Sequence, residues 1–172
     1  MVALVAADLL GLRSLLTDLV LLPFSVMVVI GSTAGGFWLQ RPSHVGKAAG
    51  LGIVAVAMIA LALATVARSV PLLVVAVAIA GLGLSWAAVT STEAATAALP
   101  EAQQGTAAAA VNTAAQIGTA LGVAVLLTIA SMIEGDTASS GRGYTVAFLA
   151  AAVLAGAVAA ALMLNPPQRR KS

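Results

Sequence analysis

Five long apolar stretches constrain the fold of this chain more than any other feature of its sequence. They lie at about residues 19–39, 48–67, 71–98, 106–132 and 145–164. A hydrocarbon core about 30 Å thick needs roughly 20 apolar residues of helix to cross it. Strands of a membrane barrel would alternate polar and apolar residues, and these stretches do not alternate. Because a spanning segment must satisfy its backbone groups internally, the sequence predicts an all-α integral membrane protein with about five transmembrane helices.

The composition agrees with a bilayer protein and excludes several other classes. Hydrophobic residues make up 61% of the 172 positions and charged residues 8%, whereas a soluble domain has about 25% charged residues. The excess of two positive charges forms no basic stripe, so we expect the lipid bilayer and no nucleic acid as a partner. With no cysteine and one histidine, the chain offers no catalytic or metal-ligating constellation. We therefore expect no enzymatic activity, no cofactor and no metal site.

The five spans occupy residues 17–164, and shorter segments flank them. Residues 1–16 are apolar but are interrupted by Asp8 and Arg13, which predicts either an interfacial segment or part of a preceding helix. No basic residue precedes this apolar run, which argues against a signal peptide. Residues 165–172 form a basic tail, of the kind that binds the cytoplasmic leaflet.

The basic residues also predict the orientation of the chain, because cytoplasmic loops are enriched in Lys and Arg. One set of alternate loops holds Arg41, Lys47, Arg169, Arg170 and Lys171. The opposite set holds Arg68 and Arg142, with Arg13 if the first segment lies there. The C-terminus is therefore predicted to be cytoplasmic.

The spans differ in polarity, which predicts what surrounds them. The spans at 48–67 and 145–164 have almost no polar side chain, as expected for helices that face lipid. The other three carry the polar and small residues, and should face protein or water. The pairs Gly31/Gly35 and Gly118/Gly122 have the four-residue spacing that allows two helices to pack closely.

Two polar stripes repeat at helical spacing and hold the candidate site residues. They comprise Trp86, Thr90 and Glu93 in the third span, and Asn112, Gln116 and Thr119 in the fourth. Glu93 is either a proton carrier or cation-binding group within the membrane, or a carboxylate at the wet end of a long helix. Asn112 and Gln116 contact either a substrate or other helices. Trp86 either lines an apolar cavity or packs between helices.

An ordered series of residues gives the sequence a family resemblance. A Leu-Pro-Phe occurs near the start of the first span, and a Pro-Glu loop precedes a fourth span rich in Asn, Gln and Gly. The matching positions are Pro100, Glu101, Gly105, Asn112, Thr113, Gln116, Gly118, Ala120, Gly122 and Ala124. This series resembles the C-terminal half of the major facilitator superfamily, in its drug:proton antiporter branch with fourteen spans. Ala115 stands where that branch has Arg.

The resemblance implies a function and a set of partners. It covers about residues 14–164 and places the five spans as the last five of a multidrug exporter in a bacterial inner membrane. Such an exporter exchanges protons for amphiphilic or cationic small molecules. Transport needs two halves around a central site, so we expect a missing N-terminal half or a partner chain. The alternatives are a helical membrane protein that only associates with other helices, and a nonfunctional transporter remnant.

Overall fold

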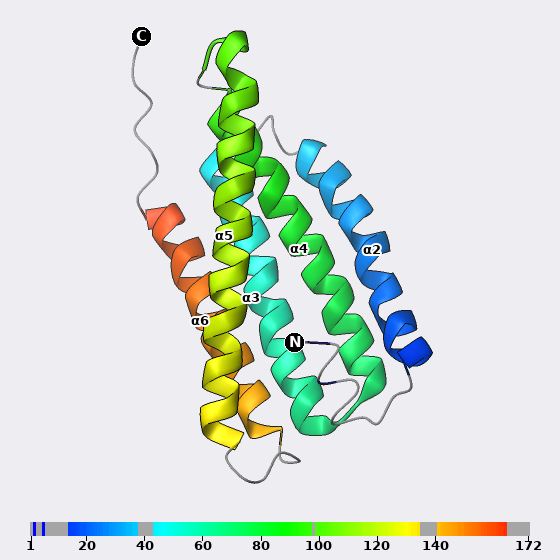
Figure 1. The fold of residues 1–172 in the computed structure, drawn as a ribbon. Helices are drawn as coiled ribbons and strands as arrows, with labels where there is room; N and C mark the ends of the chain where they lie inside the picture. Colours follow the sequence, from blue (N-terminus) through cyan, green and yellow to red (C-terminus); the bar gives the residue numbers. More distant parts are fainter. Residues whose placement is uncertain are drawn as a thin grey trace.

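The computed structural model describes residues 2, 5, 14–37, 43–97, 99–134 and 141–164. Its helices are α2 (Ser14–Phe37), α3 (Ser43–Ala67), α4 (Val70–Thr96), α5 (Glu101–Glu134) and α6 (Arg142–Leu164). They run up and down along a common direction (Figure 1). The predicted basic tail at 165–172 lies outside the described residues, and so does most of the predicted segment at 1–16.

The prediction of an all-α membrane fold is confirmed. All five helices are long and apolar enough to cross a membrane, and the described part of the chain contains no strand. Each helix begins before its apolar stretch does, most clearly α5, which begins at Glu101 rather than near residue 106. Hydropathy marks only the part of a helix that suits hydrocarbon. A helix start directly after Pro100, with an acidic first residue, is nevertheless favourable in water or at the interface.

A tight turn joins α3 to α4 and shows how the helix ends are satisfied. Arg68 adopts a left-handed conformation with φ 48°, and its N–H donates to the carbonyl of Thr65 at 3.4 Å. The N–H of Ser69 donates to the carbonyl of Ala64 at 3.2 Å. The Ser69 hydroxyl in turn accepts from the N–H of Leu72 at 3.5 Å and caps α4. Carbonyls at the end of α3 and an amide at the start of α4 therefore have partners.

The order of the helices in space differs from their order in the sequence. α4 packs between α2 and α3, and α6 packs on the other side of α3. α5 contacts α6 and, to a smaller extent, α4 (Figure 1). The resulting row is α2, α4, α3 and α6, with α4 and α3 at its centre, and α5 lies against one side of this row.

Small residues let the helices approach closely. A Cβ atom added to Gly81 of α4 would lie 2.5 Å from the carbonyl oxygen of Phe24 in α2. A Cβ atom added to Gly50 of α3 would lie 2.7 Å from the backbone nitrogen of Ala87 in α4. Both distances are shorter than real side chains tolerate, so these contacts require glycine. The bundle is held together by backbone proximity as much as by large side chains.

The apolar residues of α3 lie on two faces, one buried in the bundle and one exposed on its surface. One face is buried against α4 and α6, and Leu61 and Ala57 on that face are almost fully enclosed. The opposite face is an exposed aliphatic stripe of Val56, Ile59, Leu63 and Val66. Apolarity predicted that this helix faces lipid. The structure assigns only the exposed stripe to an outer surface and the remainder to the protein core.

Candidate functional site

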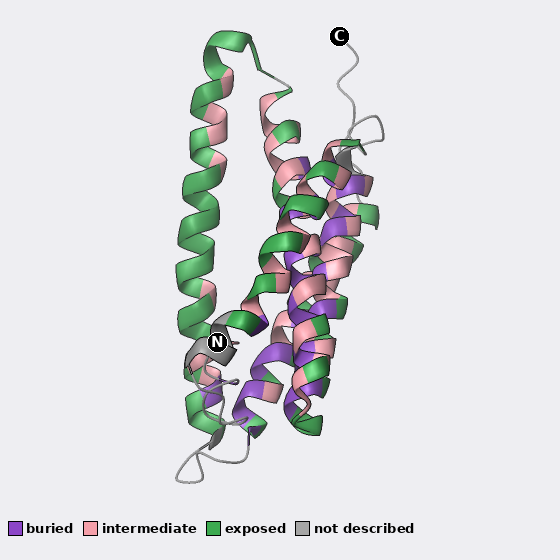
Figure 2. Ribbon diagram, turned by 90° about the vertical axis from the view of Figure 1, so that its right-hand side faces the viewer, coloured by how far each residue is buried: buried purple, intermediate pink, exposed green. Residues whose placement is uncertain are grey.

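α5 stands apart from the rest of the bundle. Most of its residues are exposed, and Figure 2 shows it as a largely separate rod beside the other four helices. Its close contact lies near its C-terminal end, where Ala130 is 3% exposed and its carbonyl faces Gly143 of α6. Leu126 and Ile129 pack against the core in the same region. The N-terminal two thirds of α5 therefore present their surface to whatever surrounds this bundle.

The polar stripe of α5 lies on this exposed surface. Asn112, Gln116 and Thr119 are all exposed. The hydroxyl of Thr119 donates to the carbonyl of Ala115 at 2.8 Å, within its own helix. The side-chain amides of Asn112 and Gln116 make no hydrogen bond to any other residue that the structure describes. Each of these amides retains donors and an acceptor that can serve another helix, water or a ligand.

The two predicted glycine pairs have different surroundings. Gly31 lies against Ser85 and Leu82 of α4, and Gly35 lies 3.4 Å from the Cα atom of Trp86, measured from an added Cβ. An added Cβ on Gly118 or Gly122 would meet nothing within 4 Å. Close packing at the pair in α5 therefore stays a prediction that concerns a neighbour other than the described helices.

The stripe predicted on α4 is divided between different neighbours. Thr90 is 3% exposed, and its hydroxyl donates to the carbonyls of Trp86 and Ala87 at 2.9 and 3.2 Å. Its methyl group lies 3.0 Å from a Cβ added to Gly46 of α3. Trp86 is half-buried. Thr90 thus contributes packing, and its hydroxyl is satisfied by its own helix.

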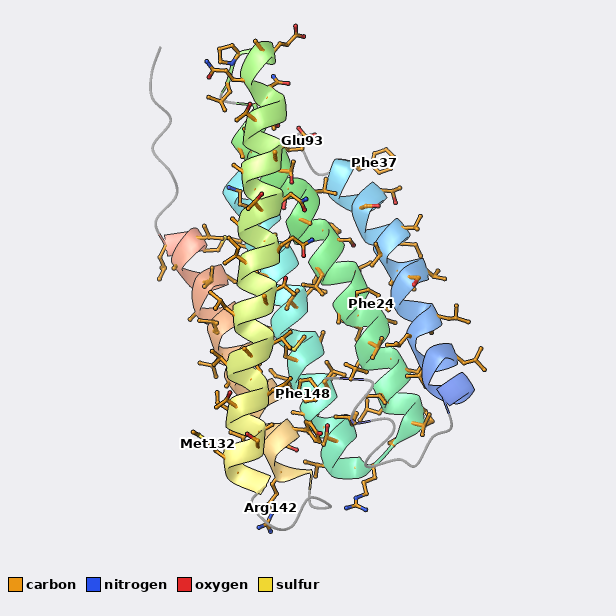
Figure 3. The ribbon with its side chains drawn as sticks, in the orientation of Figure 1. Phe24, Phe37, Glu93, Met132, Arg142 and Phe148 are labelled. Carbon is orange, nitrogen blue, oxygen red and sulfur yellow. The ribbon has the colours of Figure 1, made fainter. Side chains whose placement is uncertain are left out.

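Glu93 lies in a different environment, close to the C-terminal end of α4. Its side chain is exposed, and Figure 3 places it at the same end of the bundle as Phe37, the last residue of α2. Within the described helices no hydrogen bond joins Glu93 to Asn112 or Gln116. The structure therefore presents the carboxylate and the two amides as separate exposed polar groups on α4 and α5.

Sequence reasoning missed several packing residues. Gly46 and Gly50 have the same four-residue spacing as the predicted pairs, and both contact α4, at Thr90 and Ala87. Gly81 in α4 contacts Phe24 of α2 without such a pair. The spacing in α3 was a usable signal, whereas the contact of Gly81 depends on which helix lies opposite.

Metal chemistry has no visible basis in the described residues. Among them, no group of three or more His, Cys, Asp and Glu side chains could hold a metal ion. The polar side chains of the described site residues are amides, hydroxyls and single charged groups. These groups suit hydrogen bonding, proton exchange and ion pairing.

The fold and its exposed polar helix define a class, a multi-pass helical membrane protein. The family model of the Major Facilitator Superfamily matches residues 1–172. The chain therefore belongs to the Major Facilitator Superfamily, whose members are membrane transporters. No curated protein and no solved structure matches it.

Proposed function

We propose that this chain supplies the C-terminal helices of a proton-coupled exporter of amphiphilic or cationic small molecules. The observation that carries the proposal is the exposed polar stripe of α5. A helix surrounded by lipid gains nothing from side-chain amides, because hydrocarbon offers them no partners. Asn112 and Gln116 are therefore expected to face a second set of helices or a water-filled pathway.

The motif on α5 supports the drug:proton antiporter branch in particular. Pro100 directly precedes α5 and Glu101 begins it, and Asn112 and Gln116 follow in the order that the branch shows. Ala115 departs from the motif, because the branch has an arginine at this position. The proposed transporter therefore either works without that positive charge or has it on another residue. A bundle that served only for helix association would have no need of this ordered series, and the family match favours a transporter over that alternative.

Alternating access requires two helical units that rock about a shared site. We propose that the exposed surfaces of α5 and α2 meet the second unit, which is either an N-terminal half or a partner chain. Asn112 and Gln116 would then form hydrogen bonds across that contact or to the substrate. Bonds between membrane helices contribute about 0.6 kcal/mol each on average, so they would position the units without locking them together.

Glu93 is the proposed group for proton exchange or for binding a cationic substrate. It is an exposed carboxylate on α4. A carboxylate attracts cations, and it can take up and release a proton. Trp86 and Thr90 are proposed to support this site through helix packing, because Thr90 is buried against α3 and Trp86 is half-buried.

The proposed location is a bacterial inner membrane with the C-terminus in the cytoplasm. A reporter enzyme fused after Ser172 tests the orientation. Activity of a cytoplasm-specific reporter supports it, and activity of a periplasm-specific reporter contradicts it.

The functional test replaces the native gene by variants, so that any partner is produced as usual. Asn112→Ala and Gln116→Ala should each make cells several-fold more sensitive to an amphiphilic cation and should slow its proton-driven efflux. Thr128→Val is the matched control, because Thr128 is also exposed on α5 but its hydroxyl is bonded to its own helix at 2.8 Å. Glu93→Gln should abolish the dependence of efflux on the proton gradient.

Two results would contradict the proposal. Unchanged efflux in the Asn112 and Gln116 variants, at equal membrane levels of protein, would remove the role of the polar stripe. Clear drug resistance from this chain expressed without any second unit would refute the requirement for two units.

A further inference from the structure

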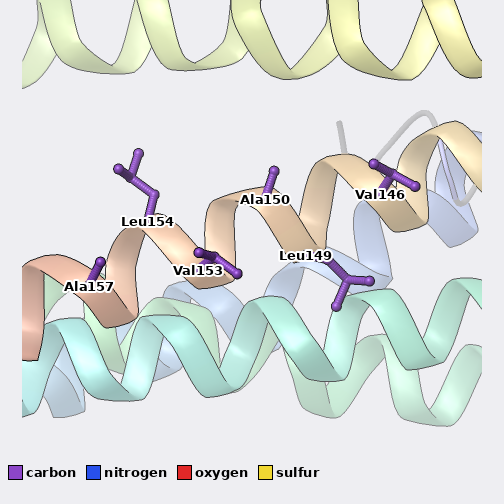
Figure 4. Close-up of a pocket in the computed structure, with 6 residues that line it drawn as sticks. All are labelled: Val146, Leu149, Ala150, Val153, Leu154 and Ala157. Carbon is purple, nitrogen blue, oxygen red and sulfur yellow. The ribbon is translucent and has the colours of Figure 1, made fainter.

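Two adjoining hollows on the surface of α6 share one residue, Val146. The first is an open groove of about 570 Å³ along α6, lined by Val146, Leu149, Ala150, Val153, Leu154 and Ala157. Figure 4 shows these side chains on the strip of α6 that lies between α5 and α3. The lining is aliphatic throughout, so the groove suits a hydrocarbon chain and no polar ligand.

The second hollow, of about 420 Å³, lies where the ends of three helices meet and contains two arginines. Arg68 follows the end of α3, and Arg142 begins α6 at the lower end of the bundle in Figure 3. Ile133, near the end of α5, also lines this second hollow, which we call the arginine corner. Two arginines that line one hollow give it a positive charge that suits an anion with several oxygen atoms, such as a phosphate.

The direction of α6 also favours an anion at the arginine corner. The α6 helix begins at Arg142, and the N-terminus of a helix carries a partial positive charge. The C-terminus of α3 would oppose this effect, but the carbonyls of Ala64 and Thr65 already accept from the turn that follows α3. Each arginine also takes part in another interaction within the chain. A guanidinium has five N–H donors and can serve an internal partner and a phosphate together.

The dimensions match one lipid molecule. Positions 146 to 157 of a helix span about 16 Å at 1.5 Å per residue. One leaflet contributes about half of a hydrocarbon core that is about 30 Å thick. The groove therefore starts at the level of the arginines and extends over the depth of a single leaflet.

We propose that the groove on α6 and the Arg68–Arg142 corner together form a binding site for one anionic phospholipid. The phosphate lies between the two guanidinium groups, and an acyl chain lies along α6 against Ala150 and Val153. The site belongs to the leaflet opposite the one that holds the C-terminal end of α6. It rests on the membrane fold alone and not on the proposed transport activity.

The test measures which lipid stays with the 172-residue chain. The protein is placed in nanodiscs with equal amounts of phosphatidylglycerol and phosphatidylcholine of identical acyl chains, and is then extracted with mild detergent. Native mass spectrometry counts the retained lipids. The site predicts preferential retention of one phosphatidylglycerol, whereas equal retention of both lipids would overturn it.

Variants separate the two parts of the site. Arg68→Gln and Arg142→Gln should each lower retention of phosphatidylglycerol about fivefold, the effect of roughly one basic residue near a lipid surface. Lys47→Gln is the matched control, since Lys47 is a basic residue near the start of α3, at the opposite end of the bundle. Equal retention by wild type and both Gln variants would overturn the proposal.

The groove is tested without changing charge. Ala150→Phe should fill the groove and lower retention of phosphatidylglycerol while leaving the arginines in place. This variant also keeps the test decisive if an arginine variant fails to fold, as judged by circular dichroism. Glycerol 3-phosphate, the soluble headgroup alone, should not displace the lipid. Displacement by it, or full retention in Ala150→Phe, would show that the groove takes no part.

Discussion

Gly50 and Gly52 of α3 offer a direct test of the close helix contact at the centre of the bundle. A Cβ atom on Gly50 would lie 2.7, 2.8 and 2.9 Å from the nitrogen, Cα and Cβ atoms of Ala87 in α4. A Cβ atom on Gly52 would meet nothing within 4 Å. The two positions lie two residues apart in the same helix, so Gly→Ala changes the same intrinsic helix propensity at both.

The structure sets the expected magnitude. The approach of 2.7 Å is 0.7 Å short of the 3.4 Å at which ordinary contact begins, and the opposing atoms include backbone that no rotamer change can move. Overpacking of this kind costs about 1–3 kcal/mol. The gain in helix propensity from Gly to Ala is at most about 1 kcal/mol. Gly50→Ala should therefore lower the free energy of unfolding by about 1–2 kcal/mol, and Gly52→Ala should leave it unchanged or slightly raised.

The assay is reversible unfolding of the chain in mixed micelles with increasing dodecyl sulfate, followed by circular dichroism. Adding Ala87→Gly to Gly50→Ala removes the contact at 2.9 Å but leaves the two shorter ones. The double variant should therefore recover only part of the lost stability. Equal stability of the Gly50→Ala and Gly52→Ala proteins would refute the argument that backbone proximity holds α3 against α4.

Three further predictions concern single positions. Val56 lies near the middle of α3 and is 56% exposed, so Val56→Arg should raise the apparent free energy of membrane insertion by about 2.5–3.5 kcal/mol, measured by glycosylation mapping. Thr90→Val should change stability by about 1 kcal/mol or less, because the lost hydroxyl bonds only carbonyls of its own helix; a larger change in dodecyl sulfate unfolding would give that hydroxyl a role between helices. The chain has no native cysteine, so Asn112→Cys should react with a water-soluble maleimide much faster than Ala130→Cys, and equal rates would contradict an aqueous or separable surface on α5.

Local sequence was sufficient to predict the helices, because hydropathy over about 20 residues reports directly on whether a segment can cross a bilayer. It was also sufficient to locate polar residues on common helix faces. Periodicity does not reveal what covers a face, however. Thr90 and Glu93 belong to one predicted stripe, yet Thr90 is buried against Gly46 and Glu93 is exposed.

Contacts between segments that are distant in the sequence could not be predicted from local sequence patterns. The corner that holds Arg68 and Arg142 combines the turn after α3 with the start of α6. Each arginine alone is an ordinary loop residue, and only the fold gives them a common hollow. In the same way, the importance of Gly81 depends on the position of Phe24 in another helix.

The row of helices described above has a consequence for how the chain is made. α2 and α3 emerge from the ribosome one after the other, but each packs chiefly against other helices, and α4 occupies the space between them. The pair must therefore enter the lipid as loosely associated neighbours and stay separated until the next helix arrives. We infer that the backbone contacts at Gly50 and Gly81 form only after α4 has been synthesised and has moved sideways into that space. In a nascent chain halted before α4, α2 and α3 would be inserted but not packed against α4, and would be open to capture by a membrane chaperone or protease.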